Sequence, residues 1–139
     1  MKKLSLSIIM PVLIASYLMA QSGDAVIGRY HLPNNLDIEI FKSDGKYLGK
    51  IIGLDGFNDG QEKDIYNPEK SNQEELLLGK IIIHGLDFDA AKNQWVNGRM
   101  CGPEKGLFFN LRITEVSPAE IKVVASKYLF WKTLSWEKI

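Results

Sequence analysis

Short runs of alternating apolar and polar residues, separated by turn residues, set the strongest constraint on how this chain folds. In residues 36–40, apolar and acidic side chains alternate, which is typical of a strand with one face toward a core and the other toward water. Asp44-Gly45 follows, a dipeptide that favours the two-residue turn of a β-hairpin, and residues 47–54 provide the returning strand. The pattern therefore predicts antiparallel sheet.

Eight such runs occur along the chain. They cover residues 26–31, 36–40, 47–54, 80–84, 94–100, 107–114, 121–125 and 130–138. Most of them are joined by short segments rich in glycine, proline and polar residues. Regularly spaced strands with tight turns favour an all-β domain, either an antiparallel sandwich or a barrel.

Residues 55–73 interrupt this regular spacing with a long polar connection. Long connections inside compact domains are usually functional lids or disordered segments. Residues 74–79 predict one helical turn that ends at Gly79. In a closed barrel, we expect the whole segment to lie across one mouth.

The first 20 residues predict where the protein works. Lys2 and Lys3 precede a mostly apolar stretch, residues 4–19, and Ala20 is the small residue expected at a cleavage site. This is the layout of a secretory signal peptide, and the stretch is too short and too weakly flanked for a membrane anchor. The residue directly after Ala20 is Gln21 and not a cysteine, so we expect no lipid anchor. We expect residues 21–139 to form one β-barrel domain that is periplasmic or secreted.

The charge pattern and the single cysteine argue against nucleic-acid binding and against an internal disulfide. The chain has 139 residues, 17 of them basic and 17 acidic, and residues 1–20 contain two of the basic residues and no acidic one. The remaining charges are spread singly, without the basic clusters that nucleic-acid binding needs, so we expect no nucleic-acid partner. Cys101 is the single cysteine and has no internal disulfide partner. In an oxidising compartment its thiol is either buried or open to intermolecular chemistry, and burial is the expectation because free cysteine is among the more buried residue types.

Several short motifs occur in an order that resembles a known family. They are Asp64-Ile65-Tyr66-Asn67-Pro68, Leu78-Gly79-Lys80, Gly98 with Pro103 and Gly106, and a terminal Trp136. The set resembles the bacterial exported family catalogued as domain of unknown function 2147, over nearly all of residues 21–139. The resemblance implies a single antiparallel, roughly eight-stranded lipocalin- or calycin-like barrel. It implies no established enzymatic activity.

The chain departs from that family in two places. Gly28-Arg29-Tyr30 resembles the Gly-x-Trp motif that opens lipocalin barrels, but it has tyrosine in place of tryptophan. Met100-Cys101-Gly102 stands where the family commonly has an aspartate and an aromatic residue. These differences leave the expected fold unchanged, but no site at that turn can be carried over.

The sequence contains no motif for catalysis or for metal binding. His31, His84 and Cys101 are far apart in the chain, whereas zinc sites usually contain closely spaced ligand pairs. The acidic segment from Asp55 to Asp64 places aromatic residues where a calcium loop needs oxygen ligands. We therefore expect no metal, no cofactor and no enzymatic activity. Asp64 and Asn67 are predicted to stabilise a turn before Pro68.

Two functions remain open from the sequence. In the first, the barrel binds a small hydrophobic ligand, such as a fatty acid or a lipid fragment, in its interior. The predicted wall residues are Ile38, Ile40, Ile52, Ile82, Phe109, Leu111, Val123 and Trp131, with Tyr47 and His84 as polar contacts near a mouth. In the second, aromatic side chains fill the barrel, and the protein acts through its surface and the long connection on an envelope or extracellular protein partner.

Overall fold

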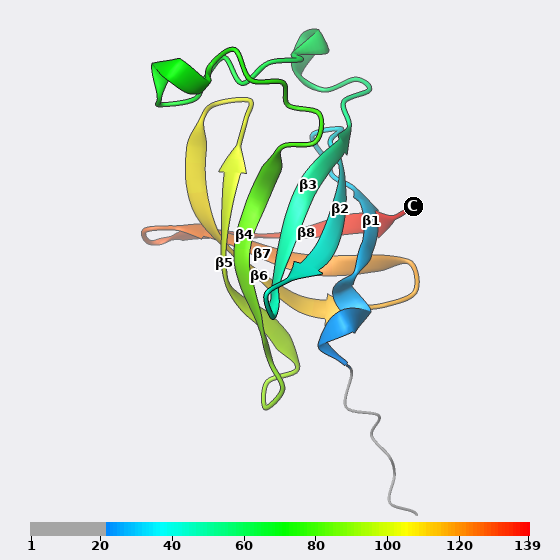
Figure 1. Cartoon of the computed structure of the whole chain (residues 1–139). Coiled ribbons are helices and arrows are strands. Elements are labelled where there is room, and N and C mark those ends of the chain that lie inside the picture. Colours follow the sequence, from blue (N-terminus) through cyan, green and yellow to red (C-terminus); the bar gives the residue numbers. More distant parts are fainter. Residues whose placement is uncertain (1–21) are drawn as a thin grey trace, which may run out of the picture.

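The structure is a computed structural model that describes residues 22–139, and it shows a closed barrel of eight antiparallel strands (Figure 1). Each strand pairs with the next one in the chain, and β8 pairs with β1 to close the barrel. The strands are β1 (Gly28–His31), β2 (Asp37–Ser43), β3 (Lys46–Gly53), β4 (Ile81–Asp89), β5 (Gln94–Gly102), β6 (Leu107–Val116), β7 (Glu120–Lys127) and β8 (Phe130–Lys138). All eight predicted strands are confirmed, and the barrel is the correct one of the two predicted architectures. The predicted signal peptide lies outside the described residues.

The hairpin between β2 and β3 forms as its sequence predicts. Ser43 lies opposite Lys46, so Asp44 and Gly45 are the two turn residues. Their φ angles are 52° and 76°, both in the left-handed region. Asp-Gly is favoured in two-residue turns because glycine adopts this conformation without steric cost.

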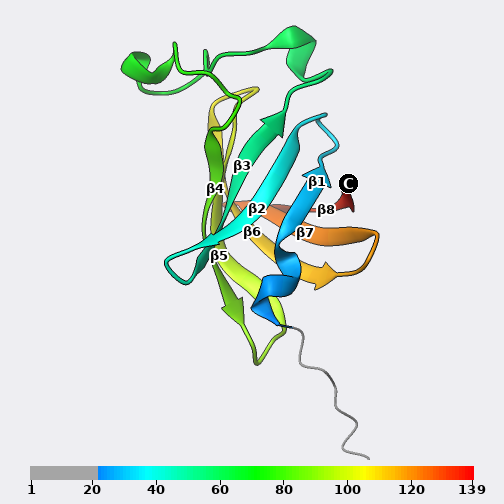
Figure 2. The same cartoon turned by 45° about the vertical axis from the view of Figure 1, so that its right-hand side comes forward.

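A short 3-10 helix, η1 (Gly23–Val26), closes one end of the barrel (Figure 2). Three aromatic side chains hold it there by hydrogen bonds. The Trp95 indole N–H donates to the Gly23 carbonyl at 2.9 Å, the Tyr30 hydroxyl donates to the Val26 carbonyl at 2.7 Å, and the Tyr47 hydroxyl donates to the Asp24 carboxylate at 2.6 Å. We call this end the plugged end.

The opposite end carries the turns β1–β2, β5–β6 and β7–β8 and the long connection between β3 and β4, which spans residues 54–80. Figure 1 shows this connection at the upper end of the barrel, and it includes two single 3-10 turns, η2 (Asn58–Gly60) and η3 (Lys70–Asn72). Two fully buried side chains, Phe57 and Leu77, attach it to the core.

The predicted helical turn at residues 74–79 is wrong in position. Backbone hydrogen bonds join this part of the connection to an earlier part, because Asp64 N–H donates to Glu75 and Leu77 N–H donates to Glu62. Lys63 and Leu76 form an isolated β-bridge between them. The segment is therefore a short extended pair, and the 3-10 turn precedes it at η3.

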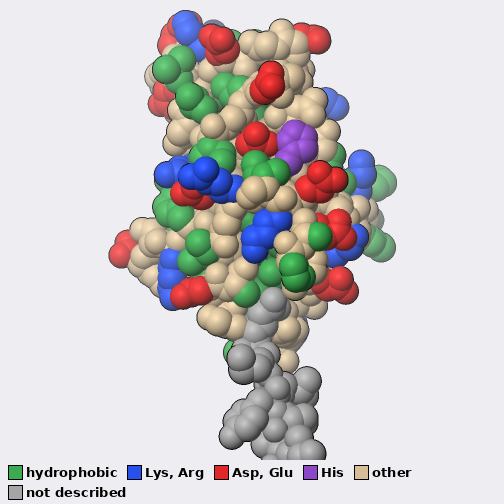
Figure 3. Space-filling model, turned by 90° about the vertical axis from the view of Figure 1, so that its right-hand side faces the viewer, with side chains coloured by type: hydrophobic (Ala, Val, Ile, Leu, Met, Phe, Trp, Pro, Cys, Tyr) green, Lys and Arg blue, Asp and Glu red, His purple; other side chains and the backbone are tan. Residues whose placement is uncertain are grey.

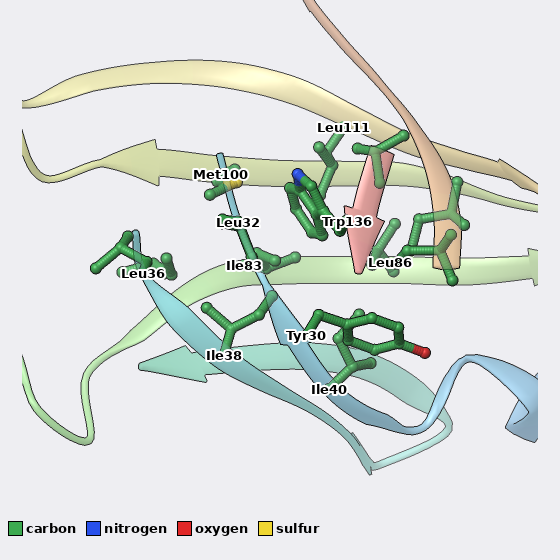
Figure 4. Packing of buried hydrophobic residues seen from close by; sticks show 14 of the residues in the cluster. Tyr30, Leu32, Leu36, Ile38, Ile40, Ile83, Leu86, Met100, Leu111 and Trp136 are labelled. Carbon is green, nitrogen blue, oxygen red and sulfur yellow. The ribbon is translucent and has the colours of Figure 1, made fainter. Parts of the chain in front are cut away.

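Apolar side chains from all the strands fill much of the barrel (Figure 4). Trp136 lies near the middle of this view, close to Leu111, and side chains of β1, β2 and β4 surround it. Trp95, Tyr30 and Ile113 are also completely buried. The inner face of the barrel is therefore a packed core over most of its length.

The outer face over β1 and β2 carries interspersed charges of both signs (Figure 3). Arg29 and Lys50 both contact Glu39, His31 contacts Asp37, and Lys42 contacts Asp24. These pairs are partly or fully exposed to solvent, so each adds little to stability. Within residues 22–139, no helix has the length and hydrophobicity needed to span a bilayer.

Candidate functional site

A pocket at the end opposite the plug reaches from the surface to the core. Its volume is about 230 Å³. It lies between the β1–β2 turn and strands β5 to β8, and its lining is Leu32, Pro33, Asn34, Met100, Gly102, Glu104, Phe109, Ala125, Lys132, Leu134 and Trp136. Because the lining combines apolar walls with a few polar groups, it has the character of a small-molecule site.

The apolar wall follows from the alternation of side chains along the strands. Ala125 lies opposite Lys132 and Val123 opposite Leu134 in the β7–β8 ladder, so Lys132, Leu134 and Trp136 share the inner face of β8. Met100 lies opposite Phe109 between β5 and β6. Figure 4 shows Met100 and Leu32 close together at one side of the Trp136 ring.

Two charged side chains of opposite sign line this otherwise apolar pocket. Glu104 is in the β5–β6 turn, and one of its carboxylate oxygens, Oε2, is buried without a hydrogen-bond partner among the described residues. Lys132 is exposed on β8 and lines the same pocket. A buried acceptor without a donor is costly, so a ligand that donates a hydrogen bond there would relieve this cost.

Most of the predicted wall residues are buried, but they belong to the packed core. Ile38, Ile40, Ile82, Leu111 and Val123 are almost completely inaccessible to solvent. None of these five lines the pocket. Phe109, by contrast, lines it from β6.

Four of the predicted positions differ from the prediction. Ile52 is half-buried because it is one position out of phase with Tyr47, Gly49 and Ile51, the inward residues of β3. A β-bulge between Asp37 and Ile38 places Ile51, not Ile52, opposite Ile38. Tyr47 is buried, but its hydroxyl binds Asp24 at the plugged end, away from the pocket.

The other two predicted residues are on the surface. Trp131 is 75% exposed because it lies beside the β7–β8 turn, where Phe130 is 80% exposed as well. It is also one position out of phase with Leu134 and Trp136, which face the interior. His84 is exposed opposite Arg99 on the outer face of β4. The assignment of Trp131 to the barrel wall is therefore wrong, and His84, predicted as a polar contact near a mouth, does not line the pocket.

The sequence prediction missed Leu32, Met100, Glu104, Lys132 and Trp136. One signal was available for β8, because inward positions alternate and Trp136 therefore predicts Leu134 and Lys132 on the same face. The contribution of the β1–β2 and β5–β6 turns depends on how the strands are arranged around the barrel. No local pattern shows this.

A charged cluster lies in the long connection, which contacts the β5–β6 turn through a hydrogen bond from the Gln61 side chain to the Pro103 carbonyl. The buried Asp64 carboxylate accepts hydrogen bonds from Lys80 Nζ at 2.6 Å and from Asn67 Nδ2 at 2.7 Å through one oxygen, Oδ2, and its other oxygen has no partner within the described chain. Burial lowers the pKa of the Lys80 ammonium, but its bonds to Asp64 and Glu75 outweigh that effect and raise the net pKa. Lys80 therefore remains protonated, and its ion pair with Asp64 joins the middle of the long connection to the residue that precedes β4.

Asn67 and Cys101 complete this region. Asn67 Oδ1 accepts a hydrogen bond from the Glu69 N–H, which confirms the predicted turn around Pro68. Cys101 is half-buried rather than fully buried, and burial, followed by the charge of Asp64, raises the pKa of its thiol. A thiol with a raised pKa is a weak nucleophile at neutral pH.

No group of three or more His, Cys, Asp or Glu residues in the range 22–139 is arranged to hold a metal ion.

Comparison with known proteins agrees with this architecture. No curated protein matches the chain. The structure is similar to that of protein HP1028 from the human pathogen Helicobacter pylori, which is described as belonging to the lipocalin family, with a TM-score of 0.72, 19% identity and 82% of each chain covered. At this identity the likeness establishes the lipocalin-like fold. Residues 28–138 match the family described as "Uncharacterized protein conserved in bacteria (DUF2147)", and the chain therefore belongs to that family.

Proposed function

We propose that this protein is an exported lipocalin-like barrel that binds a small hydrophobic ligand, such as a fatty acid or a lipid fragment, in the pocket beside Trp136. The observation that carries this proposal is the apolar pocket of about 230 Å³ that reaches the core at the end opposite the plug. The lipocalin-like fold is compatible with it, because the interior of an eight-stranded barrel is either filled by side chains or holds one small ligand, and here the packed core leaves this pocket at one end.

The pocket volume limits how much of the ligand is enclosed. Ligand pockets commonly have volumes of about 300 to 1,000 Å³, so this one is small. A short acyl segment therefore contacts Trp136, Met100 and Leu32, and the rest of the ligand extends toward the pocket mouth.

The charges in the pocket determine where the polar end of the ligand is placed. A carboxylate is attracted by the Lys132 ammonium and repelled by Glu104, whereas a hydroxyl group can donate to the free Oε2 atom of Glu104. Fatty acids and fatty alcohols of the same chain length therefore respond differently to changes at Lys132.

The first test reduces the volume of the pocket. Ala125→Leu places a larger side chain on the pocket wall, and Ala91→Leu is a matched control on the exposed β4–β5 turn. With Trp131→Phe as the common background, the remaining Trp95 and Trp136 are both buried, so a saturable change in emission on titration with octanoate or octanol reports the interior. We expect Ala125→Leu to abolish this change and Ala91→Leu to preserve it.

The second test examines the polar end of the ligand. Lys132→Gln should weaken octanoate binding by up to about fivefold, because an exposed ion pair contributes at most about 1 kcal/mol. It should leave octanol binding unchanged. Native mass spectrometry of the protein purified from its producing cells would identify a ligand that is retained. A folded protein that shows no saturable response to fatty acids, alcohols or lipid fragments would contradict the proposal.

One observation favours the alternative function, an envelope interaction module. The barrel is filled over most of its length, and large apolar side chains are exposed on the β7–β8 hairpin. Equal ligand responses in Ala125→Leu and the wild type would favour this alternative.

A further inference from the structure

The turn between β7 and β8 exposes four consecutive large apolar side chains. Tyr128, Leu129, Phe130 and Trp131 are 91%, 87%, 80% and 75% exposed. Lys127 precedes them and Lys132 follows, and we call residues 127–132 the hairpin tip. In Figure 1 the tip projects sideways from the barrel. Leu107 and Phe108, both also exposed, lie at the start of the neighbouring strand β6.

The backbone of the hairpin tip is itself unusual. Lys127 lies opposite Phe130, so Tyr128 and Leu129 are the two turn residues. Tyr128 has a φ angle of 55°, in the left-handed region that bulky residues rarely adopt. The β2–β3 hairpin of the same barrel uses Asp-Gly in its turn, the usual choice. The tip thus keeps an exposed aromatic residue at a position where the backbone disfavours it, and such strain commonly marks a functional segment.

The charged residues around the hairpin tip are basic. Three shallow surface hollows lie around it, and the charged residues that line them are Arg99, Arg112, Lys127 and Lys132. No carboxylate of residues 22–139 lines any of the three. The Arg99 guanidinium lies 5.1 Å from the centre of the Phe108 ring, which brings a cation and an exposed aromatic side chain together.

This combination points to one kind of partner. Tyrosine and tryptophan prefer the interface between lipid and water, where their rings are in an apolar medium and their polar groups remain hydrated. Lysine and arginine beside them are attracted to anionic headgroups. A second copy of the chain fits less well, because a symmetric contact through this surface would bring four cations against the same four.

We propose that the hairpin tip docks this protein reversibly on anionic lipid bilayers. Tyr128, Leu129, Phe130 and Trp131 enter the interfacial layer, and Lys127, Lys132 and Arg99 contact the headgroups. This attachment is peripheral and needs no membrane-spanning segment.

The test measures binding to vesicles of phosphatidylglycerol and phosphatidylethanolamine, with phosphatidylcholine vesicles as the neutral comparison. Trp131 is exposed whereas Trp95 and Trp136 are buried, so a blue shift of tryptophan emission on adding vesicles reports insertion of the tip. We expect co-sedimentation and the blue shift with the anionic vesicles, both weakened by added salt. All comparisons use chains with identical N-termini, so residues 1–21 contribute equally.

Two pairs of variants separate the apolar and the electrostatic contributions. Phe130→Ser with Trp131→Ser should lower co-sedimentation at least about tenfold, whereas Leu76→Ser with Leu78→Ser, at two exposed leucines of the long connection, should leave it unchanged. Arg99→Gln with Lys127→Gln should lower it by about an order of magnitude. Lys70→Gln with Lys92→Gln removes the same net charge from exposed positions elsewhere and should have little effect.

Circular dichroism should show that all variants are folded, because the altered side chains lie on the surface. If the serine pair does not fold, the Arg99 and Lys127 pair still tests the proposal. Absence of binding to anionic vesicles, equal binding to neutral ones, or binding unaffected by the tip variants would overturn it. A protein partner captured through the tip without any vesicle binding would also overturn it. The Arg99→Gln and Lys127→Gln pair should keep the octanol response of the wild type, because neither residue lines the pocket beside Trp136, so the docking and ligand-binding proposals are tested separately.

Discussion

Tyr47 illustrates how one side chain joins the packed core to the plug. Its ring is buried, and its hydroxyl donates a hydrogen bond to Asp24 at 2.6 Å. Burial, followed by the bond to Asp24, raises the pKa of Tyr47 from 10.0 to about 12. Burial alone raises the pKa of Tyr30, which binds the other end of η1, to about 12.

The raised pKa values of these two tyrosines predict that the folded state loses stability at alkaline pH. A group that has a higher pKa in the folded state contributes its full stability below the unfolded pKa, here about 10, and loses it as the pH rises toward 12. The free energy of unfolding should therefore fall between pH 10 and 12. Tyr47→Phe should reduce this fall by about 1 to 2 kcal/mol, because phenylalanine cannot ionise.

Urea unfolding at pH 9 and at pH 11.5 would measure the effect. The exposed Tyr66→Phe serves as the control and should retain the slope of the wild type. A Tyr47→Phe variant whose free energy of unfolding has the same pH dependence as that of the wild type would contradict the raised pKa of Tyr47.

At the residue scale, the sequence predicts which side chains are apolar and buried better than it predicts what they line. Ile38, Ile40, Leu111 and Val123 follow the alternation and are buried as expected. Trp131 and Ile52 fail for the same reason. Trp131 is out of phase with Leu134 and Trp136, and Ile52 is out of phase with Tyr47 and Ile51, and both alternations are already present in the sequence.

At the scale of elements, the β2–β3 hairpin gives the sharpest prediction. Gly45 has a φ angle of 76°, and a Cβ added there would meet no atom within 4 Å. The cost of Gly45→Val therefore comes from the backbone conformation alone. It should be about 1 to 3 kcal/mol in the free energy of unfolding. Asparagine tolerates left-handed φ, so Gly45→Asn should cost much less.

Chemical denaturation of the three proteins would check this order. An unchanged midpoint for Gly45→Val would mean that the turn adopts another geometry in solution.

The strands themselves were predictable because each is a local pattern ended by turn residues. All eight lie where the alternation places them, although β4 is longer than predicted and extends to Asp89. The segment at residues 74–79 was mispredicted because its backbone partners are at residues 62–64, a pairing that local propensity does not reveal. The pocket was not predicted for the same reason, because its lining comes from two turns and four strands that are distant in the sequence.

At the scale of the whole molecule, the sequence predicts export. The basic start, the apolar stretch and Ala20 predict cleavage between Ala20 and Gln21. N-terminal sequencing of protein recovered from the periplasm or the medium should therefore begin at Gln21. Recovery of the chain from the cytoplasm with Met1 at its start would contradict the prediction.

The closure of the barrel has a consequence for how the chain acquires its structure. Every other pair of neighbouring strands is consecutive in the chain, but β1 and β8 come from opposite ends of the described chain. They meet through a short ladder in which Tyr30 lies opposite Lys138 and His31 opposite Glu137. Joining such distant strands costs the most chain entropy, so this seam should form last during folding. A chain that crosses a membrane unfolded would thus be unable to close its barrel until its last strand had emerged.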